Sequence, residues 1–279
     1  MAINYEVEYN NRARVPEHPE IFARWQREGA TYRAAARKAE FGISYGPSSR
    51  QTIDLFPAAG PRAPLALFIH GGWWRSLEPT MFSQTARGPN AHGVTIAVAG
   101  YDLCPQVSVA QIVEQMRAAC LLLWRKYSRR IFVFGHSAGG HLAACLIATD
   151  WKSVAPDPPA DLVPAAYAIS GVFDLAPLVT ISVNADLKLD IKSANDLSPL
   201  YWRVPAGRSL DAVVGALESS EFLRQSHAIV DGWKDKATTR YEEIAGTNHF
   251  TIVDPLADPS SAMTRRVVKL AKQVGAMSL

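Results

Sequence analysis

Five residues, Gly135 to Gly139 with the sequence GHSAG, place a serine between two glycines in a setting where its side chain could do chemistry. An apolar run, residues 130 to 135, leads into them, and an alanine-rich stretch typical of a helix follows. A chain that turns from strand to helix within a few residues strains the backbone of its serine, and flanking glycines remove side chains that would collide there. The hydroxyl of Ser137 would then be exposed at the carboxyl end of a sheet, as a nucleophile requires. The alternative is a serine in a glycine-rich turn that has no chemical role.

A serine needs a histidine to take its proton, and that histidine needs a carboxylate to orient it. When the serine lies on a strand-to-helix turn, the acid and the histidine follow it in the chain, which leaves His227 and His249. His249 lies in the loop GTNHF after the β-rich run 239 to 246, so it can reach the carboxyl edge of a sheet. His227 lies inside a helical stretch that points it away from the serine. We therefore expect His249 to be the base.

The acid should follow the β-rich run that precedes this histidine loop. That run, residues 211 to 217, ends at Glu218, and Glu221 lies three residues further on. Asp211 stands at the wrong end of the run, and Asp174 follows an earlier strand and is the weaker candidate. The spacing alone leaves both glutamates open.

The loop after the apolar run 65 to 69 has the sequence HGGWW. Acyl transfer needs N–H donors for the developing oxyanion, one from the residue after the nucleophile, here Ala138, and others from a loop after an earlier strand. Gly71 and Gly72 let this loop approach a substrate carbonyl closely, and Trp73 could add a further N–H. We expect these four residues to form an oxyanion hole.

Large apolar side chains next to these donors would shape a binding site for a flat substrate. We expect Trp73 and Trp74 to line it, together with His136, the variable residue of the turn. The alternative for either tryptophan is that it only anchors the loop in the core. His70 is expected to brace the loop rather than to react.

Strands and helices alternate along most of the chain and would position these residues. Several apolar runs are continuous, which suits strands buried on both faces of a parallel sheet. Apolar residues between 109 and 127 recur at spacings of three and four, as on one face of a helix. The sequence predicts an α/β fold, a mostly parallel doubly wound sheet flanked by helices. The expected strands lie at residues 51–56, 65–69, 94–100, 130–135, 165–170, 211–217 and 239–246.

The alternation continues almost to the end of the chain, so we expect one domain over residues 1–279. Residues 1–45 are expected to be an N-terminal helical segment. Residues 171–210 separate two strands by a long, proline-punctuated connection, and connections of that length are usually functional insertions. We expect a small cap there.

The composition excludes several classes of protein. A net charge of +3 over 279 residues, with scattered basic residues, argues against nucleic acid or a membrane surface as a partner. Three cysteines without a paired spacing predict neither a disulfide framework nor a metal site. The polar start and the lack of a long apolar run predict a cytoplasmic protein. A homodimer stays open.

The motifs together resemble those of the arylformamidase (kynurenine formamidase) branch of the α/β-hydrolase fold, related to hormone-sensitive-lipase-like esterases. The resemblance rests on HGGWW, GHSAGGHLAA, SGVFDLAPL with SPL, and ESSEFLRQS followed by GTNHF, and spans roughly residues 45 to 275. It implies hydrolysis of an N-formyl aryl amide, as in N-formyl-L-kynurenine, without a cofactor. The chain departs from the pattern at the acid, where glutamate replaces the expected aspartate.

Local sequence and the resemblance agree on which glutamate orients the histidine. Glu218 directly follows the strand, and the related hydrolases have their acid at this position. Glu221 would lie in the first turn of a helix capped by Ser219 or Ser220, where the helix dipole is a sufficient reason for a carboxylate. We expect Ser137, Glu218 and His249 to form a catalytic triad.

The substrate is less closely defined than the chemistry. The two tryptophans favour an aryl amide or aryl ester, and a general carboxylesterase for short acyl esters is the alternative. A non-catalytic binding protein on the same fold is a remote third candidate, because all three triad residues are present in order.

Overall fold

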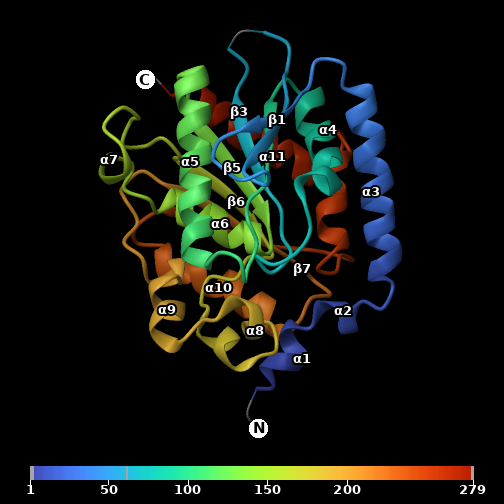
Figure 1. Ribbon diagram of the computed structural model, residues 1–279, viewed down its shortest axis with the longest axis vertical. Helices are drawn as coiled ribbons and strands as arrows, with labels where there is room; N and C mark the ends of the chain where they lie inside the picture. Colours follow the sequence, from blue (N-terminus) through green and yellow to red (C-terminus); the bar gives the residue numbers. More distant parts are fainter. Residues whose placement is uncertain (1–2, 61, 278–279) are drawn as a thin grey trace.

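An eight-stranded sheet runs through the centre of the molecule (Figure 1), and the computed structural model describes residues 3–60 and 62–277. The strand order is β1-β2-β4-β3-β5-β6-β7-β8. Strand β2 pairs antiparallel with both β1 and β4, and every other neighbouring pair in the sheet is parallel. The strands are β1 (Glu40–Ser44), β2 (Thr52–Phe56), β3 (Leu65–Ile69), β4 (Thr95–Ala99), β5 (Ile131–His136), β6 (Ala165–Ile169), β7 (Ser209–Gly215) and β8 (Thr238–Ile244).

The four central strands explain why their sequences are continuously apolar. Every residue of β3, β4, β5 and β6 is buried, because helices cover both faces of the sheet. Alternate residues of each strand belong to different cores. Leu67 belongs to the core that also contains residues of α5 (Val109–Tyr127), α6 (Ala138–Ile147) and α10 (Ser220–Trp233). Phe68 belongs to the core that contains residues of α3 (His18–Ala35) and α11 (Ala262–Gly275). The predicted fold class, a mostly parallel α/β sheet flanked by helices, is confirmed.

The longer helices begin and end where local sequence dictates. The predicted helix over residues 109–127 is α5, and Ser108 and Gln111 form a reciprocal capping box at its start. It ends at Ser128, which adopts a left-handed conformation. The other long helices are α3 (His18–Ala35), α6 (Ala138–Ile147), α10 (Ser220–Trp233) and α11 (Ala262–Gly275).

Two expected segment boundaries need correction. Residues 1–45 are not helical throughout, because β1 occupies Glu40–Ser44 and adds an antiparallel edge strand. Residues 171–210 contain short helices as expected, but Ser209 and Leu210 already belong to β7. The short helices of this insertion are η2 (Ala176–Thr180), α8 (Asn184–Leu187), α9 (Ile191–Asp196) and η3 (Pro199–Tyr201).

The first residues of the chain cover the end of the molecule where the insertion lies. Helices α1 (Tyr5–Tyr9) and α2 (Asn11–Arg14) lie at the same end as α8, α9 and α10 in Figure 1. The Glu6 carboxylate accepts hydrogen bonds from the Ser182 backbone N–H and hydroxyl, both at 2.7 Å. Buried Tyr9 donates to Glu221 at the start of α10 at 3.1 Å. The N-terminal segment is thus joined to both the insertion and α10.

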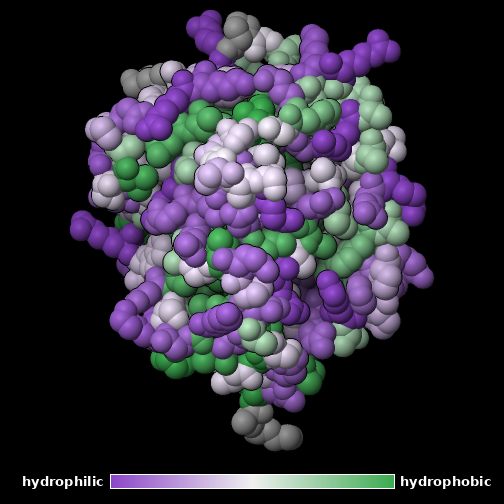
Figure 2. All heavy atoms as spheres, in the orientation of Figure 1, coloured by the Kyte–Doolittle hydropathy of each residue, from purple (hydrophilic) through white to green (hydrophobic). Residues whose placement is uncertain are grey.

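The surface mixes hydrophilic and hydrophobic residues on the face shown in Figure 2. The large apolar side chains that are exposed lie on separate elements, among them Phe41 on β1, Ile191 on α9 and Leu217 after β7. Within the described residues, no helix combines the length and the apolar character needed to cross a bilayer.

A buried histidine connects α6 to the insertion and makes stability depend on pH. The Nε2–H of His141 donates to the Leu197 carbonyl at 2.8 Å, and burial lowers the pKa of His141 to about 4. The unfolded chain therefore takes up a proton below pH 6.5 that the folded chain does not, and stability falls as the pH falls.

Between pH 7 and pH 5, wild-type protein should lose about 2 kcal/mol more unfolding free energy than His141→Gln, whose amide can keep the bond to Leu197. Urea unfolding at the two pH values measures the difference. His227→Gln, an exposed residue of α10, is the control and should retain the wild-type pH dependence. Equal losses of unfolding free energy in wild type and His141→Gln would contradict the conclusion that the lowered pKa of His141 makes stability depend on pH.

Candidate active site

Ser137 sits on a sharp turn between β5 and α6, as the sequence predicts. Its φ of 57° and ψ of −117° lie outside the regions that most residues adopt. The flanking glycines are required for space: a Cβ at Gly135 would lie 2.3 Å from the Gly139 carbonyl oxygen, and one at Gly139 would lie 2.0 Å from the Ile69 carbonyl oxygen. Strand β3, which ends at Ile69, and the first turn of α6 therefore pack backbone to backbone.

The structure brings Ser137, His249 and Glu218 into one hydrogen-bonded chain. The Nε2 of His249 lies 3.0 Å from the Ser137 hydroxyl, and its Nδ1 lies 2.6 Å from a Glu218 carboxylate oxygen. Because a carboxylate only accepts, Nδ1 carries the proton and Nε2 accepts from the serine. All three residues are buried. This arrangement lets the imidazole take the hydroxyl proton while the carboxylate fixes its tautomer.

Glu218 is held on both carboxylate oxygens. The oxygen that does not face His249 accepts from the Ser170 hydroxyl at 2.5 Å and from the Gly215 N–H at 2.7 Å. Glu221 lies in the first turn of α10, where it was expected. Its carboxylate accepts from Arg224 at 2.8 Å and from Tyr9 rather than from the histidine.

In the loop after β3 the backbone carbonyls accept hydrogen bonds, whereas several backbone N–H groups have no acceptor. The Gly71 carbonyl accepts from His70 Nδ1 at 2.7 Å, and the Gly72 carbonyl accepts from the Arg75 N–H at 3.0 Å and the Ser76 hydroxyl at 2.9 Å. In the described part of the chain, the backbone N–H groups of the expected oxyanion residues donate to no acceptor: those of Gly71, Gly72, Trp73 and Ala138. They are free to donate to a ligand.

His70 supports this loop through contacts of its ring and of its backbone carbonyl. Its ring stacks on Tyr101 at 4.3 Å between centroids, and the Tyr101 hydroxyl donates to the His70 carbonyl at 2.9 Å. Burial lowers the pKa of His70 to about 4, so the ring is neutral and its Nδ1–H remains a donor to Gly71 at neutral pH. The expectation that His70 supports the loop is confirmed.

The two tryptophans have different positions, which corrects one prediction. Both adopt left-handed backbone angles, with φ of 54° at Trp73 and 53° at Trp74. Trp73 lines the cavity and packs edge-on against Tyr9 at 5.9 Å. Trp74 is fully buried and meets His141 edge-on at 4.9 Å. Trp74 therefore anchors the loop in the core and is not part of the cavity wall, although its ring lies only 6.2 Å from that of Trp73.

His136 lines the cavity and also positions the histidine loop. Its Nε2 lies 2.7 Å from the His249 backbone carbonyl, which only accepts, so Nε2 carries the proton. Burial and the neighbouring His249 ring keep the pKa of His136 well below its ordinary value. A neutral ring thus holds the backbone of His249 in place, while contact between His136 and substrate stays a prediction.

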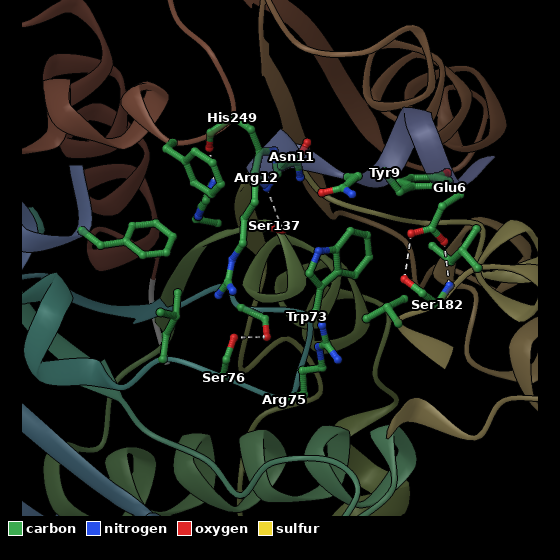
Figure 3. Close-up of a pocket in the computed structure, with 18 of the residues that line it drawn as sticks. Glu6, Tyr9, Asn11, Arg12, Trp73, Arg75, Ser76, Ser137, Ser182 and His249 are labelled. Atoms are coloured by element: carbon green, nitrogen blue, oxygen red, sulfur yellow. Dashed lines mark hydrogen bonds between the residues drawn. The ribbon is translucent and has the colours of Figure 1, made fainter. Parts of the chain in front are cut away.

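A cavity of about 200 Å³ opens in front of Ser137 and His249 (Figure 3). Its walls come from the loop after β3, from the insertion through Ile181, Ser182 and Val183, and from Phe250. The N-terminal segment supplies the remaining wall, which sequence reasoning did not foresee: Glu6, Tyr9, Asn10, Asn11, Arg12, Phe22 and Trp25. Among the described residues, no three His, Cys, Asp or Glu side chains cluster so as to hold a metal ion.

Residues 66–202 match the family described as alpha/beta hydrolase fold, and relatives named kynurenine formamidase match most of the chain. Together these matches define the class: the protein is an enzyme, a hydrolase on this fold. The kynurenine formamidase of Drosophila melanogaster is 30% identical over 241 residues, 80% of this chain and 78% of that protein. The kynurenine formamidase of Danio rerio is 27% identical over 238 residues, 82% of this chain and 80% of that protein. The chain belongs to the kynurenine formamidase family, as its motifs indicated.

Solved structures share the same architecture. A crystal structure of a candidate thioesterase from Silicibacter sp. TM1040 superposes with a TM-score of 0.85 at 29% identity, over 96% of this chain and all of that one. An esterase of Pyrobaculum calidifontis superposes with a TM-score of 0.67 at 17% identity, over 93% of this chain and 92% of that one. The latter likeness concerns the fold alone.

The backbone contact at Gly139 predicts the effect of one added methyl group. Gly139→Ala should lower the free energy of unfolding by about 1–3 kcal/mol, because its Cβ meets a backbone carbonyl that cannot move aside. Urea denaturation measures this. Gly232→Ala in α10 is the matched control, since its Cβ meets only the end of the Leu200 side chain. Equal stability of the two variants would show that β3 and α6 can separate at low cost.

Proposed function

We propose that the protein is a serine hydrolase that cleaves N-formyl aryl amides, with Ser137 as nucleophile, His249 as base and Glu218 as the orienting acid. The observation that carries the proposal is the hydrogen-bonded chain from the Ser137 hydroxyl through His249 to Glu218, at 3.0 and 2.6 Å. Relatives named kynurenine formamidase, aligned over most of their length, support the choice of substrate.

In this mechanism, His249 takes the proton of Ser137 as the hydroxyl oxygen attacks the formyl carbon. The carbonyl oxygen becomes an oxyanion, and the donors available to it are the unpaired N–H groups of Gly71, Gly72, Trp73 and Ala138. The imidazolium then gives its proton to the aryl amine, which leaves as the carbon–nitrogen bond breaks. A water molecule, deprotonated by His249, attacks the formyl ester of Ser137 and releases formate and the free serine.

The cavity favours a small acyl group and a flat leaving group. Its volume of about 200 Å³ is below the roughly 300–1,000 Å³ of sites for drug-sized ligands. Trp73 offers an aromatic face beside the nucleophile, and Phe250 and Phe22 add apolar walls. The insertion, through Ile181 to Val183, acts as a cap over this space.

Esters are the second candidate substrates, because the same oxyanion site and triad serve any acyl transfer. The Silicibacter neighbour adds a short acyl thioester to the compounds worth testing.

Steady-state kinetics on an N-formyl aryl amide, the matching aryl acetate and a short acyl thioester test the function. We expect the highest kcat/KM for the formyl amide, and Ser137→Ala should lower kcat on every substrate by a factor of about 10⁴. A fluorophosphonate probe should label wild type and not Ser137→Ala. A clear preference for the acetate or thioester would replace the formamidase proposal, and absence of labelling of the wild-type protein would refute Ser137 as the nucleophile.

The two glutamates should separate catalysis from structure. Glu218→Gln should lower kcat by about 10⁴, because its single amide oxygen cannot accept from His249, Ser170 and Gly215 together. Glu221→Gln should keep kcat close to wild type and lose about 1–3 kcal/mol of stability, since it weakens charged hydrogen bonds to Arg224. Kinetics and urea unfolding of both variants check this, and exchanged phenotypes would refute the acid assignment.

A further inference from the structure

Phe222, in the first turn of α10, packs against the imidazole of His249. The two ring centres are 4.4 Å apart, and the ring planes are inclined at 46°. The centres of two other rings near the imidazole, those of His136 and Phe250, lie further away, at 4.8 and 5.5 Å. Phe222 is fully buried and does not line the cavity. It therefore contacts the base without being placed to contact a substrate.

The start of α10 fixes the position of Phe222 relative to the acid. Ser219 caps the helix by accepting from the Phe222 backbone N–H at 3.4 Å. Glu218, directly before the cap, accepts from Nδ1 of His249 at 2.6 Å. The same short stretch of chain thus carries the carboxylate that bonds the imidazole and the aromatic ring that packs against it.

Two aromatic residues of the cavity wall pack against Phe222 in turn. The ring of Tyr9 meets it edge-on at 5.5 Å between centres, and the ring of Trp73 lies 6.3 Å away. Tyr9 is itself held by its hydrogen bond to Glu221. Because closely packed side chains resist displacement, these neighbours keep the Phe222 ring against His249.

Hydrogen bonds hold the imidazole firmly during only part of the proposed reaction. In the resting enzyme, His249 bonds to both Ser137 and Glu218. Once Ser137 carries the acyl group, its oxygen has no proton to donate, and the bond to Glu218 remains. The torsion that turns a histidine ring has broad minima, so packing must set the orientation of the imidazole in this intermediate.

We propose that Phe222 is a positioning residue that keeps Nε2 of His249 in place to activate the hydrolytic water. In that step His249 takes a proton from water as the water oxygen bonds to the acyl carbon. The bond from this carbon to Oγ of Ser137 then breaks, and the proton passes to Oγ. This inference rests on the proposed function for the acyl-enzyme. It predicts that loss of the Phe222 ring slows deacylation more than acylation.

Phe222→Leu removes the ring and keeps an apolar side chain. The acetyl-enzyme formed with a chromogenic aryl acetate can be followed by rapid quenching and intact-mass spectrometry. Its hydrolysis should be roughly tenfold slower in the variant, because a displaced base loses its alignment with the water. Its formation should slow by no more than about twofold, since the hydrogen bond to Ser137 still orients the imidazole in that step.

Ile229→Val is the matched control, because Ile229 is also buried in α10 and the substitution removes apolar packing away from His249. Both rate constants should stay at the wild-type values in this variant. Equal slowing of the two steps in Phe222→Leu, or the same selective slowing in Ile229→Val, would overturn the proposal and leave Phe222 a purely structural role.

A measurement without turnover separates this inference from the proposed function. In Ser137→Ala the imidazole keeps only its bond to Glu218, as in the acyl-enzyme, and the proton on Nδ1 should give a downfield NMR resonance. Adding Phe222→Leu should broaden that resonance through exchange with water, and adding Ile229→Val should not. An unchanged resonance would overturn the positioning role while leaving the hydrolase proposal intact. Absence of acetyl-enzyme in wild type would refute the nucleophile, and the resonance would still decide whether Phe222 holds the imidazole.

Discussion

The backbone contact between the first turn of α6 and the neighbouring strand ends is the constraint on which the site depends. Because Gly139 has no side chain, α6 lies directly against the backbone carbonyl of Ile69. Gly140 lies equally close to Gly171, since a Cβ added to Gly140 would lie 3.0 Å from the Gly171 Cα. The ends of β3, β5 and β6 are thereby drawn to one point. The loop with the unpaired N–H groups follows β3, Ser137 follows β5, and the insertion follows β6, so these two close contacts gather three of the cavity's components.

Sequence predicted the central sheet and the catalytic candidates because their signals are local. Continuous apolar runs marked the buried parallel strands, and glycine spacing marked the turn at Ser137. It missed β1, whose residues are mostly exposed at the sheet edge and so lack an apolar pattern. The sequence also could not separate Trp73 from Trp74, because adjacent residues of one type have the same propensity. They differ in their tertiary contacts, since Trp73 packs against Tyr9 and Trp74 against His141.

The cavity wall formed by the N-terminal segment had no sequence signal of its own. Asn11 and Arg12 belong to a four-residue helix that is too short to be stable by itself. The preceding helix α1 holds the segment in place through polar contacts of Glu6 and Tyr9 with the insertion and α10, between residues that are remote in the chain. Such contacts depend on side-chain geometry that neither periodicity nor composition records, which is why the candidate triad could be predicted and this wall of the cavity could not.

The bond between Tyr9 and Glu221 joins residues 212 positions apart, and this separation has a consequence for how the enzyme matures. The chain is synthesised from its N-terminus, so Tyr9 cannot form this hydrogen bond until Glu221, 212 residues later, has been synthesised. The sheet up to β6 can assemble earlier, because its strands are adjacent in sequence or nearly so. A nascent chain can therefore form the turn at Ser137 before the N-terminal segment is able to close the cavity in front of it.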